Sequence, residues 1–231
     1  MIPLGVIASS QAGTQSQVPT DVTQVQEWSV SSATGPATGP STTAGSCLIA
    51  RIVHRQGSSG RTVEVSDAAG NDWREIATVA AGGSGDLSMW YCENALPTTS
   101  VQALVGGAAS TRYLFVVEWA GIALEDALVD FAALSNPSAT GAHPAAKVQT
   151  EAPGALVVGS LGATVSNRSF DLTPASITAG YVPGIEHRGN QSTLISASLV
   201  GAPAGEHGPQ WILSGSASTT GVITAAFRPA T

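Results

Sequence analysis

The segment VEVSDAAGNDWREIATV, residues 63–79, contains two runs that favour β-strands and a polar stretch between them. Residues 62–65 and 73–79 are rich in β-branched and apolar side chains, which fit a pleated sheet. The stretch between them, SDAAGND at 66–72, carries Asp, Asn and Gly, which readily adopt turn conformations. The pattern predicts a β-hairpin in which Trp73 points into the core and its indole N–H finds a hydrogen-bond partner.

A calcium loop is the alternative for the same stretch, because Asp67, Asn71 and Asp72 supply oxygen ligands. An EF-hand requires ligands at alternate positions of a twelve-residue loop that ends in glutamate. Here alanine occupies positions 68 and 69, and Glu75 falls within the following strand. We therefore predict a turn and keep a surface calcium site only as the alternative.

The rest of the chain, from Asp21 onward, has regularly spaced turn-forming residues, as expected of an all-β protein. Gly, Pro, Asn or Asp interrupts it about every 8–12 residues, which is typical of a sandwich or a barrel. We expect strands at 22–30, 47–55, 62–65, 73–79, 87–93, 101–105, 113–119, 128–134, 146–150, 156–161, 194–200, 211–213 and 222–227. Residues 31–46 are expected to form a long surface loop, and 162–192 an irregular region. The predicted fold is a two-sheet antiparallel β-sandwich of jelly-roll type, residues 21–231.

Hydrophobic periodicity separates fully covered strands from half-covered ones. YLFVVEW (113–119) and LVVGSL (156–161) are apolar on both faces, which predicts central strands. Apolar residues alternate in 47–55 and 194–200, so each of these strands is expected to have one solvent-exposed face. The one helix expected is ALEDALVD (123–130), in which two leucines lie four residues apart.

Residues 1–20 differ from the rest of the chain: an apolar tip, IPLGVIA at 2–8, precedes a stretch rich in Ser, Gln and Gly. An exposed apolar tip is a liability on a free monomer. We therefore expect an extended N-terminal anchoring arm that docks on its own domain or on a neighbour. The expected partner-binding residues are Ile2, Pro3, Leu4, Val6 and Ile7. The alternative is a frayed terminus.

Composition narrows the range of partners. Only 11% of the 231 residues are charged, the net charge is −7, and Lys147 is the only lysine. Without a cluster of Arg and Lys, binding to nucleic acid is not expected. No apolar run is long enough to span a membrane as a helix, and the apolar start has no basic flank, which argues against a secretion signal. The weakly charged surface suggests that partner chains cover part of it.

No motif for catalysis or cofactor binding is evident. The four histidines lie in separate segments without metal-ligand spacing, and no G-x-S-x-G elbow or phosphate-binding glycine loop occurs. Glu118, alone in an apolar strand, is the best single carboxylate for glycoside hydrolysis, but we expect it to be buried with a structural partner. Cys47 and Cys92 are expected to be buried free thiols, with a disulfide as the alternative. We predict a protein that is not an enzyme and needs no cofactor.

The tryptophans leave a binding function open. Trp28, Trp90, Trp119 and Trp211 lie in strand-like runs, where aromatic residues usually belong to the core. On an exposed sheet face they would instead stack on sugars.

The order of four segments resembles a β-sandwich module of tailed-bacteriophage structural proteins, especially minor tail proteins and head decoration proteins of phages that infect GC-rich bacteria. The segments are VEVSDAAGNDWREIA, LSMWYCENA, LFVVEWAG and GALVVGSL, and the resemblance covers about residues 45–165. The start MIPLGVIA also resembles those of small virion proteins of such phages.

The resemblance implies a virion protein, assembled in the bacterial cytoplasm, that contacts other structural proteins and forms homo-oligomers in the particle. It implies no catalytic residue. We expect a minor tail protein that docks through its arm. The alternatives are a head decoration protein and a module that binds host-surface glycans.

Overall fold

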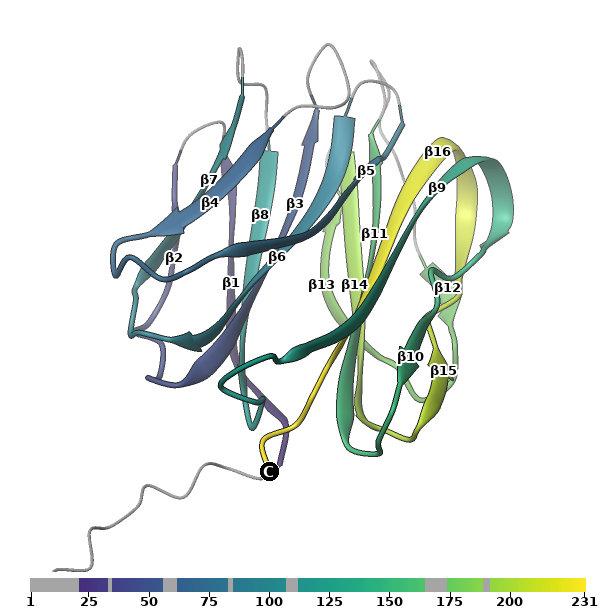
Figure 1. Cartoon of the computed structure of the whole chain (residues 1–231). Coiled ribbons are helices and arrows are strands. Elements are labelled where there is room, and N and C mark those ends of the chain that lie inside the picture. Colours follow the sequence, from purple (N-terminus) through teal and green to yellow (C-terminus); the bar gives the residue numbers. More distant parts are fainter. Residues whose placement is uncertain are drawn as a thin grey trace, which may run out of the picture.

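The protein is an all-β molecule in a computed structural model that describes residues 21–32, 35–55, 62–82, 85–106, 112–164, 174–188 and 192–231. Within these residues there are sixteen strands and no helix. Residues 1–20, including the predicted partner-binding residues Ile2, Pro3, Leu4, Val6 and Ile7, lie outside the described part. The predicted all-β sandwich is confirmed (Figure 1).

The first half of the chain builds one large sheet and one small sheet. The large sheet has the order β1-β8-β3-β6-β5, with bounds Thr23–Ser32, Arg112–Ala120, Ser46–Arg55, Gly85–Ala95 and Arg74–Ala80. The small sheet has the order β2-β7-β4, with bounds Ala37–Thr38, Ser100–Val105 and Val63–Asp67. It covers the outer face of the large sheet, and the two enclose an apolar cluster that includes Trp28 and Trp73.

The second half builds a large sheet in the order β9-β16-β11-β14-β13. Its strands run Leu128–His143, Trp211–Phe227, Ala155–Thr164, Ser192–Ala202 and Val182–Arg188. Strand β12 (Pro174–Ile177) pairs with the beginning of β16, and β10 (Val148–Thr150) pairs with β15 (Gly205–His207). Two small clusters of mostly Ala and Val lie on the outer face of this sheet.

The two halves repeat one strand order. Adding eight to each label of β1-β8-β3-β6-β5 gives β9-β16-β11-β14-β13, and the pair β2–β7 corresponds to β10–β15. The halves therefore have equivalent topology in their large sheets.

The large sheets of the two halves face each other across a shared core (Figure 1). Strand β3 lies against β11 and β14, β6 lies against β11 and β16, and β5 lies against β9 and β16. Within the described residues, the backbones of β1 and β8 come less close to β13 and β14, and side chains bridge the gap: the Tyr113 ring of β8 stacks on the His187 ring of β13, with ring centroids 3.3 Å apart. We call the edge with β5 and β9 the closed side, and the edge with β1 and β13 the open side.

The helix predicted at 123–130 is wrong. The chain bends through this segment, Asp126 has a φ of 50°, and β9 begins at Leu128. The backbone N–H of Ala123 donates to the Arg228 carbonyl (3.0 Å), and that of Ala127 donates to the Glu93 carboxylate (2.7 Å). Partners elsewhere in the fold thus replace the hydrogen bonds of a helical turn.

The predicted hairpin is also wrong, because β4 pairs with β7 while β5 pairs with β6. The stretch between β4 and β5 is a turn that carries the chain from the small sheet to the large one. The predicted surface loop at 31–46 contributes β2, whose Ala37 is buried. In the predicted irregular region 162–192, β12 and β13 are formed, and 165–173 and 189–191 lie outside the described residues.

The central strands were predicted correctly: β8 lies inside the first large sheet and β11 lies in the middle of the second. The solvent-exposed face predicted for 47–55 is wrong. Strand β3 is buried on both faces, because the small sheet covers one face and the second half covers the other. The first six residues of β14, predicted to be half-covered, are likewise buried. A search of the described residues finds no helix long and apolar enough to cross a membrane.

Candidate functional site

The open side of the sandwich contains a narrow crevice between the two large sheets. Its walls come from β1, β3 and β8 on one side and from β13 and β14 on the other, and its volume is about 10 Å³. Gln24 and Glu27 of β1 and Trp119 of β8 face Gly184 of β13 and Ser198 of β14. A space of this size admits about one polar atom or one water molecule.

Arg51 in the wall of this crevice is unusual for a buried arginine. Strand alternation places it on the same face as Ile49 and Val53, so it points towards the second half, and only 3% of its surface is exposed. Its Nε–H makes no hydrogen bond among the described residues. Burial lowers the pKa of the guanidinium to about 10, and the charge of Glu27 opposes this shift. Arg51 is therefore still charged at neutral pH, and its Nε–H lies beneath the surface of the crevice.

Three exposed valines lie on the strands that line the crevice. Val182 of β13 is 63% exposed and lies opposite Ser198 of β14, a crevice residue. Val200 is two residues further along β14 on the same face and is 47% exposed. Val25, 46% exposed, sits in the β-bulge of β1 next to Gln24. On the open side, the buried Arg51 thus lies close to strands that carry exposed valines. We call these valines, Val25, Val182 and Val200, the rim.

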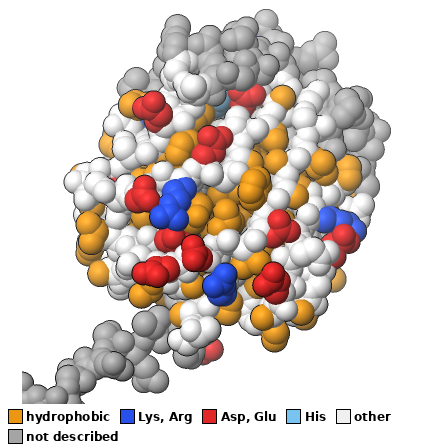
Figure 2. Space-filling model, in the orientation of Figure 1, with side chains coloured by type: hydrophobic (Ala, Val, Ile, Leu, Met, Phe, Trp, Pro, Cys, Tyr) orange, Lys and Arg blue, Asp and Glu red, His pale blue; other side chains and the backbone are white. Residues whose placement is uncertain are grey.

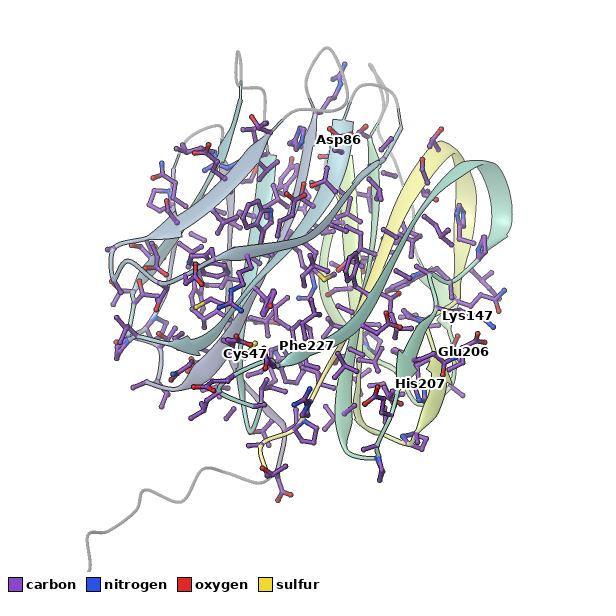
Figure 3. The ribbon with its side chains drawn as sticks, viewed as in Figure 1. Cys47, Asp86, Lys147, Glu206, His207 and Phe227 are labelled. Atoms are coloured by element: carbon purple, nitrogen blue, oxygen red, sulfur yellow. The ribbon has the colours of Figure 1, made fainter. Side chains whose placement is uncertain are left out.

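A second polar group is buried at the opposite end of the outer core of the first half. His54, Asp86 and Arg112 lie side by side on β3, β6 and β8, and all three are almost fully buried. The His54 Nε2 is 3.6 Å from the Asp86 carboxylate, and the Arg112 Nη2 donates to the Gly35 carbonyl (2.8 Å). Figure 3 shows Asp86 at the end of its strand. These three residues connect neighbouring strands, and Arg112 also binds the loop that contains Gly35. Their contacts indicate a structural role.

Glu118, the best catalytic candidate from the sequence, has structural partners as predicted. It is fully buried, and its two carboxylate oxygens accept hydrogen bonds from Gln26 Nε2 (2.6 Å) and from the Thr43 backbone N–H (2.7 Å). Both oxygens are thus engaged in holding β1 and the loop before β3 against β8.

The Asp67 carboxylate organises the turn between β4 and β5. One oxygen accepts from the backbone N–H groups of Ala69 (2.9 Å) and Asn71 (3.2 Å). The other accepts from the Asn71 side chain and from the Trp73 indole, both at 2.8 Å. The prediction that Trp73 is buried with a partner is confirmed. Asn71 also exchanges two hydrogen bonds with Leu96, so the turn is held by protein groups.

The two cysteines are free and buried, as predicted. Cys47 belongs to the shared core and Cys92 to the outer core of the first half, so they lie on opposite faces of one sheet. Burial raises the pKa of both thiols, that of Cys92 to about 12. Figure 3 shows Cys47 near Phe227, between the halves. Among the described residues, no group of three or more His, Cys, Asp or Glu could hold a metal ion.

None of the five tryptophans is exposed. Trp28, Trp73, Trp119 and Trp211 are buried, and Trp90 is half-buried. The sequence left open whether any tryptophan is exposed, and the structure places four of them in the core. Figure 2 shows charged side chains scattered among uncharged and apolar ones on the face of the closed side.

No family model, no curated protein and no solved structure matches this chain. Its function must therefore be inferred from its sequence and its geometry.

Sequence reasoning missed the open side. Arg51 had a detectable signal, because it stands in an alternating apolar strand in phase with Ile49 and Val53. A charged residue at such a position predicts a buried cation. Val182 and Val200 had no such signal, since only the pairing of β13 with β14 brings them together.

Proposed function

We propose that this chain is a non-enzymatic structural protein of a tailed-phage virion, a minor tail protein that docks on neighbouring subunits through residues 1–20. The sequence resemblance supplies the class of protein. The observation that supports an assembly role is the open side, where exposed valines lie on the strands that line a crevice with a buried arginine. A chain in which only 11% of the residues are charged favours contact with other chains over a dispersed monomer.

The buried polar groups support a structural role over an enzymatic one. The carboxylates of Glu118 and Asp67 accept hydrogen bonds that join strands and turns. A catalytic carboxylate must instead reach a substrate. The burial of the tryptophans argues against the glycan-binding alternative, since sugar stacking requires an exposed aromatic face.

Deleting residues 2–10 tests the proposal. The sandwich begins at residue 23, so the truncated chain should keep its thermal melting temperature while its incorporation into particles is lost. Immunogold labelling of particles that carry the full chain distinguishes a tail protein from the alternative, a head decoration protein. A truncated chain that still enters particles at the normal level would contradict the anchoring role.

A further inference from the structure

We propose that the open side is the acceptor for the N-terminal arm: residues 2–7 of one copy lie in extended form along β1 of a neighbouring copy, over the crevice that contains Arg51. This rests on the proposed function, because it names the surface to which the anchoring arm binds.

Arg51 defines the chemistry of the ligand. Its buried guanidinium is charged and lines the crevice, so it attracts an acceptor placed there, and its Nε–H makes no hydrogen bond to a described residue. Glu27 already places a negative charge nearby, so a second carboxylate in the crevice would be repelled. An uncharged acceptor, such as a backbone carbonyl, fits best. Residues 1–20 contain no charged side chain.

The shape of the crevice indicates how such a segment would lie. A volume of about 10 Å³ accommodates a carbonyl oxygen but not a whole strand, so the segment must cover the opening from outside. There, its apolar side chains would meet the rim formed by Val25, Val182 and Val200. Burying these side chains supplies the apolar part of the binding free energy.

The two edges of the open side differ in their capacity to accept a strand. Strand β13 contains Pro183 and an irregularity between Pro183 and Glu186, features that block edge pairing. Strand β1 pairs regularly with β8 from Gln26 to Ser32, and its other edge has no partner strand in the described sheet. Strand addition is therefore expected along β1.

The N-terminal arm is long enough to reach a neighbouring copy of the protein. Asp21, the first described residue after the arm, lies against Gly121 at the lower end of β1. Fourteen peptide units between Ile7 and Asp21 span at most about 50 Å. This exceeds the roughly 33 Å length of a ten-residue strand, so the tip can reach an adjacent molecule.

Cysteine cross-linking tests the contact. The pair Leu4→Cys and Val182→Cys, in the otherwise intact chain, should give disulfide-linked oligomers on a non-reducing gel after mild oxidation. The control pair Leu4→Cys and Ile212→Cys places the second thiol at a comparably exposed apolar site on β16 of the second half. It should cross-link at least about tenfold more slowly.

A second variant tests the role of Arg51. Arg51→Met keeps a long side chain in the crevice and removes the donor, and it should lower the cross-linking rate of the first pair by about tenfold or more. A circular dichroism melt that matches that of the unsubstituted chain shows that the fold is kept.

Three results would overturn the proposal: equal cross-linking by both pairs, a disulfide only within single chains, or a rate unaffected by Arg51→Met in a folded protein. If deletion of residues 2–10 still abolishes incorporation in any of these cases, the anchoring function stands and only the acceptor surface is wrong.

Discussion

The two halves of the molecule share a strand order and differ in how their outer faces are covered. In the first half a three-stranded sheet encloses a cluster with two tryptophans. In the second half, β10 and β15 form only a two-stranded sheet, and β12 joins β16 instead. Among the described residues, the second half exposes the large apolar side chains of Phe131, Leu134, Val182, Val200 and Ile212, and the first half exposes those of Val25, Leu96 and Leu104.

This difference shows that one topology can be built on unequal cores. In the first half, a single cluster that includes Trp28 and Trp73 fills the space under the outer sheet, whereas the outer face of the second half carries two smaller clusters, one of which includes Trp211. Both halves contribute residues to the core that they share. The exposed residues of the second half remain available to partner chains.

The largest expected effect comes from the shared core. Phe227 is fully buried there and packs edge to face on Tyr91 of the first half, with ring centroids 5.7 Å apart. Phe227→Ala should lower the free energy of unfolding by about 3–5 kcal/mol. Both halves should still unfold in one urea transition, in which tryptophan fluorescence and far-UV circular dichroism coincide.

Phe131→Ala is the matched control, because Phe131 is about half exposed in the same half of the molecule. Its effect should stay within about 0.5 kcal/mol. Separate transitions for the two probes in Phe227→Ala would show that the halves are independent units.

A smaller effect should distinguish the equivalent turns β4–β5 and β12–β13. Asp67→Ala removes four hydrogen bonds and leaves the buried Trp73 indole without its partner, which should cost about 2–4 kcal/mol. In the second half, Thr178→Ala removes one bond from the Gln210 N–H and should cost about 0.5–1 kcal/mol. Equal losses in chemical denaturation would refute the view that the first half has the more strongly organised outer layer.

The smallest predicted effect is a pH dependence centred on the second half. Burial lowers the pKa of His143 and of His187 below the usual value of 6.5. The unfolded chain therefore binds protons more readily, so the stabilisation is complete above pH 6.5 and is lost as the pH falls towards the lowered values.

His143→Gln should reduce this slope between pH 6.5 and 5, as measured by urea denaturation at successive pH values. His207→Gln, at a partly exposed position on β15, serves as the control. If His143→Gln leaves the change in the free energy of unfolding between pH 6.5 and 5 unaltered, His143 does not contribute to the pH dependence.

Local patterns in the sequence predicted local features well. The two-sided apolar runs identified β8 and β11 as central strands, and the partners of Trp73 and Glu118 follow from the need to satisfy buried polar groups. Pairing between distant strands was not predictable, because both β6 and β7 offer compatible partners for the segments that flank the turn at Asp67.

The helix at 123–130 failed for a related reason: its leucine spacing fits a helix, but tertiary hydrogen bonds with Glu93 and Arg228 determine the backbone. The repeated strand order has no counterpart in the sequence, because sheet topology can recur without matching residues. The jelly-roll type stays a prediction. The first and last strands of each half do lie side by side, but β5 belongs to the large sheet of the first half and does not extend the small one.

The central claim is that the molecule binds its neighbours through the open side. Amide hydrogen exchange, compared between the isolated protein and its assembled form, tests this most directly. The account predicts that protection rises in residues 26–32 of β1 and is unchanged in β5 and β9. Protection gained only in β5 and β9, or in neither edge, would contradict it.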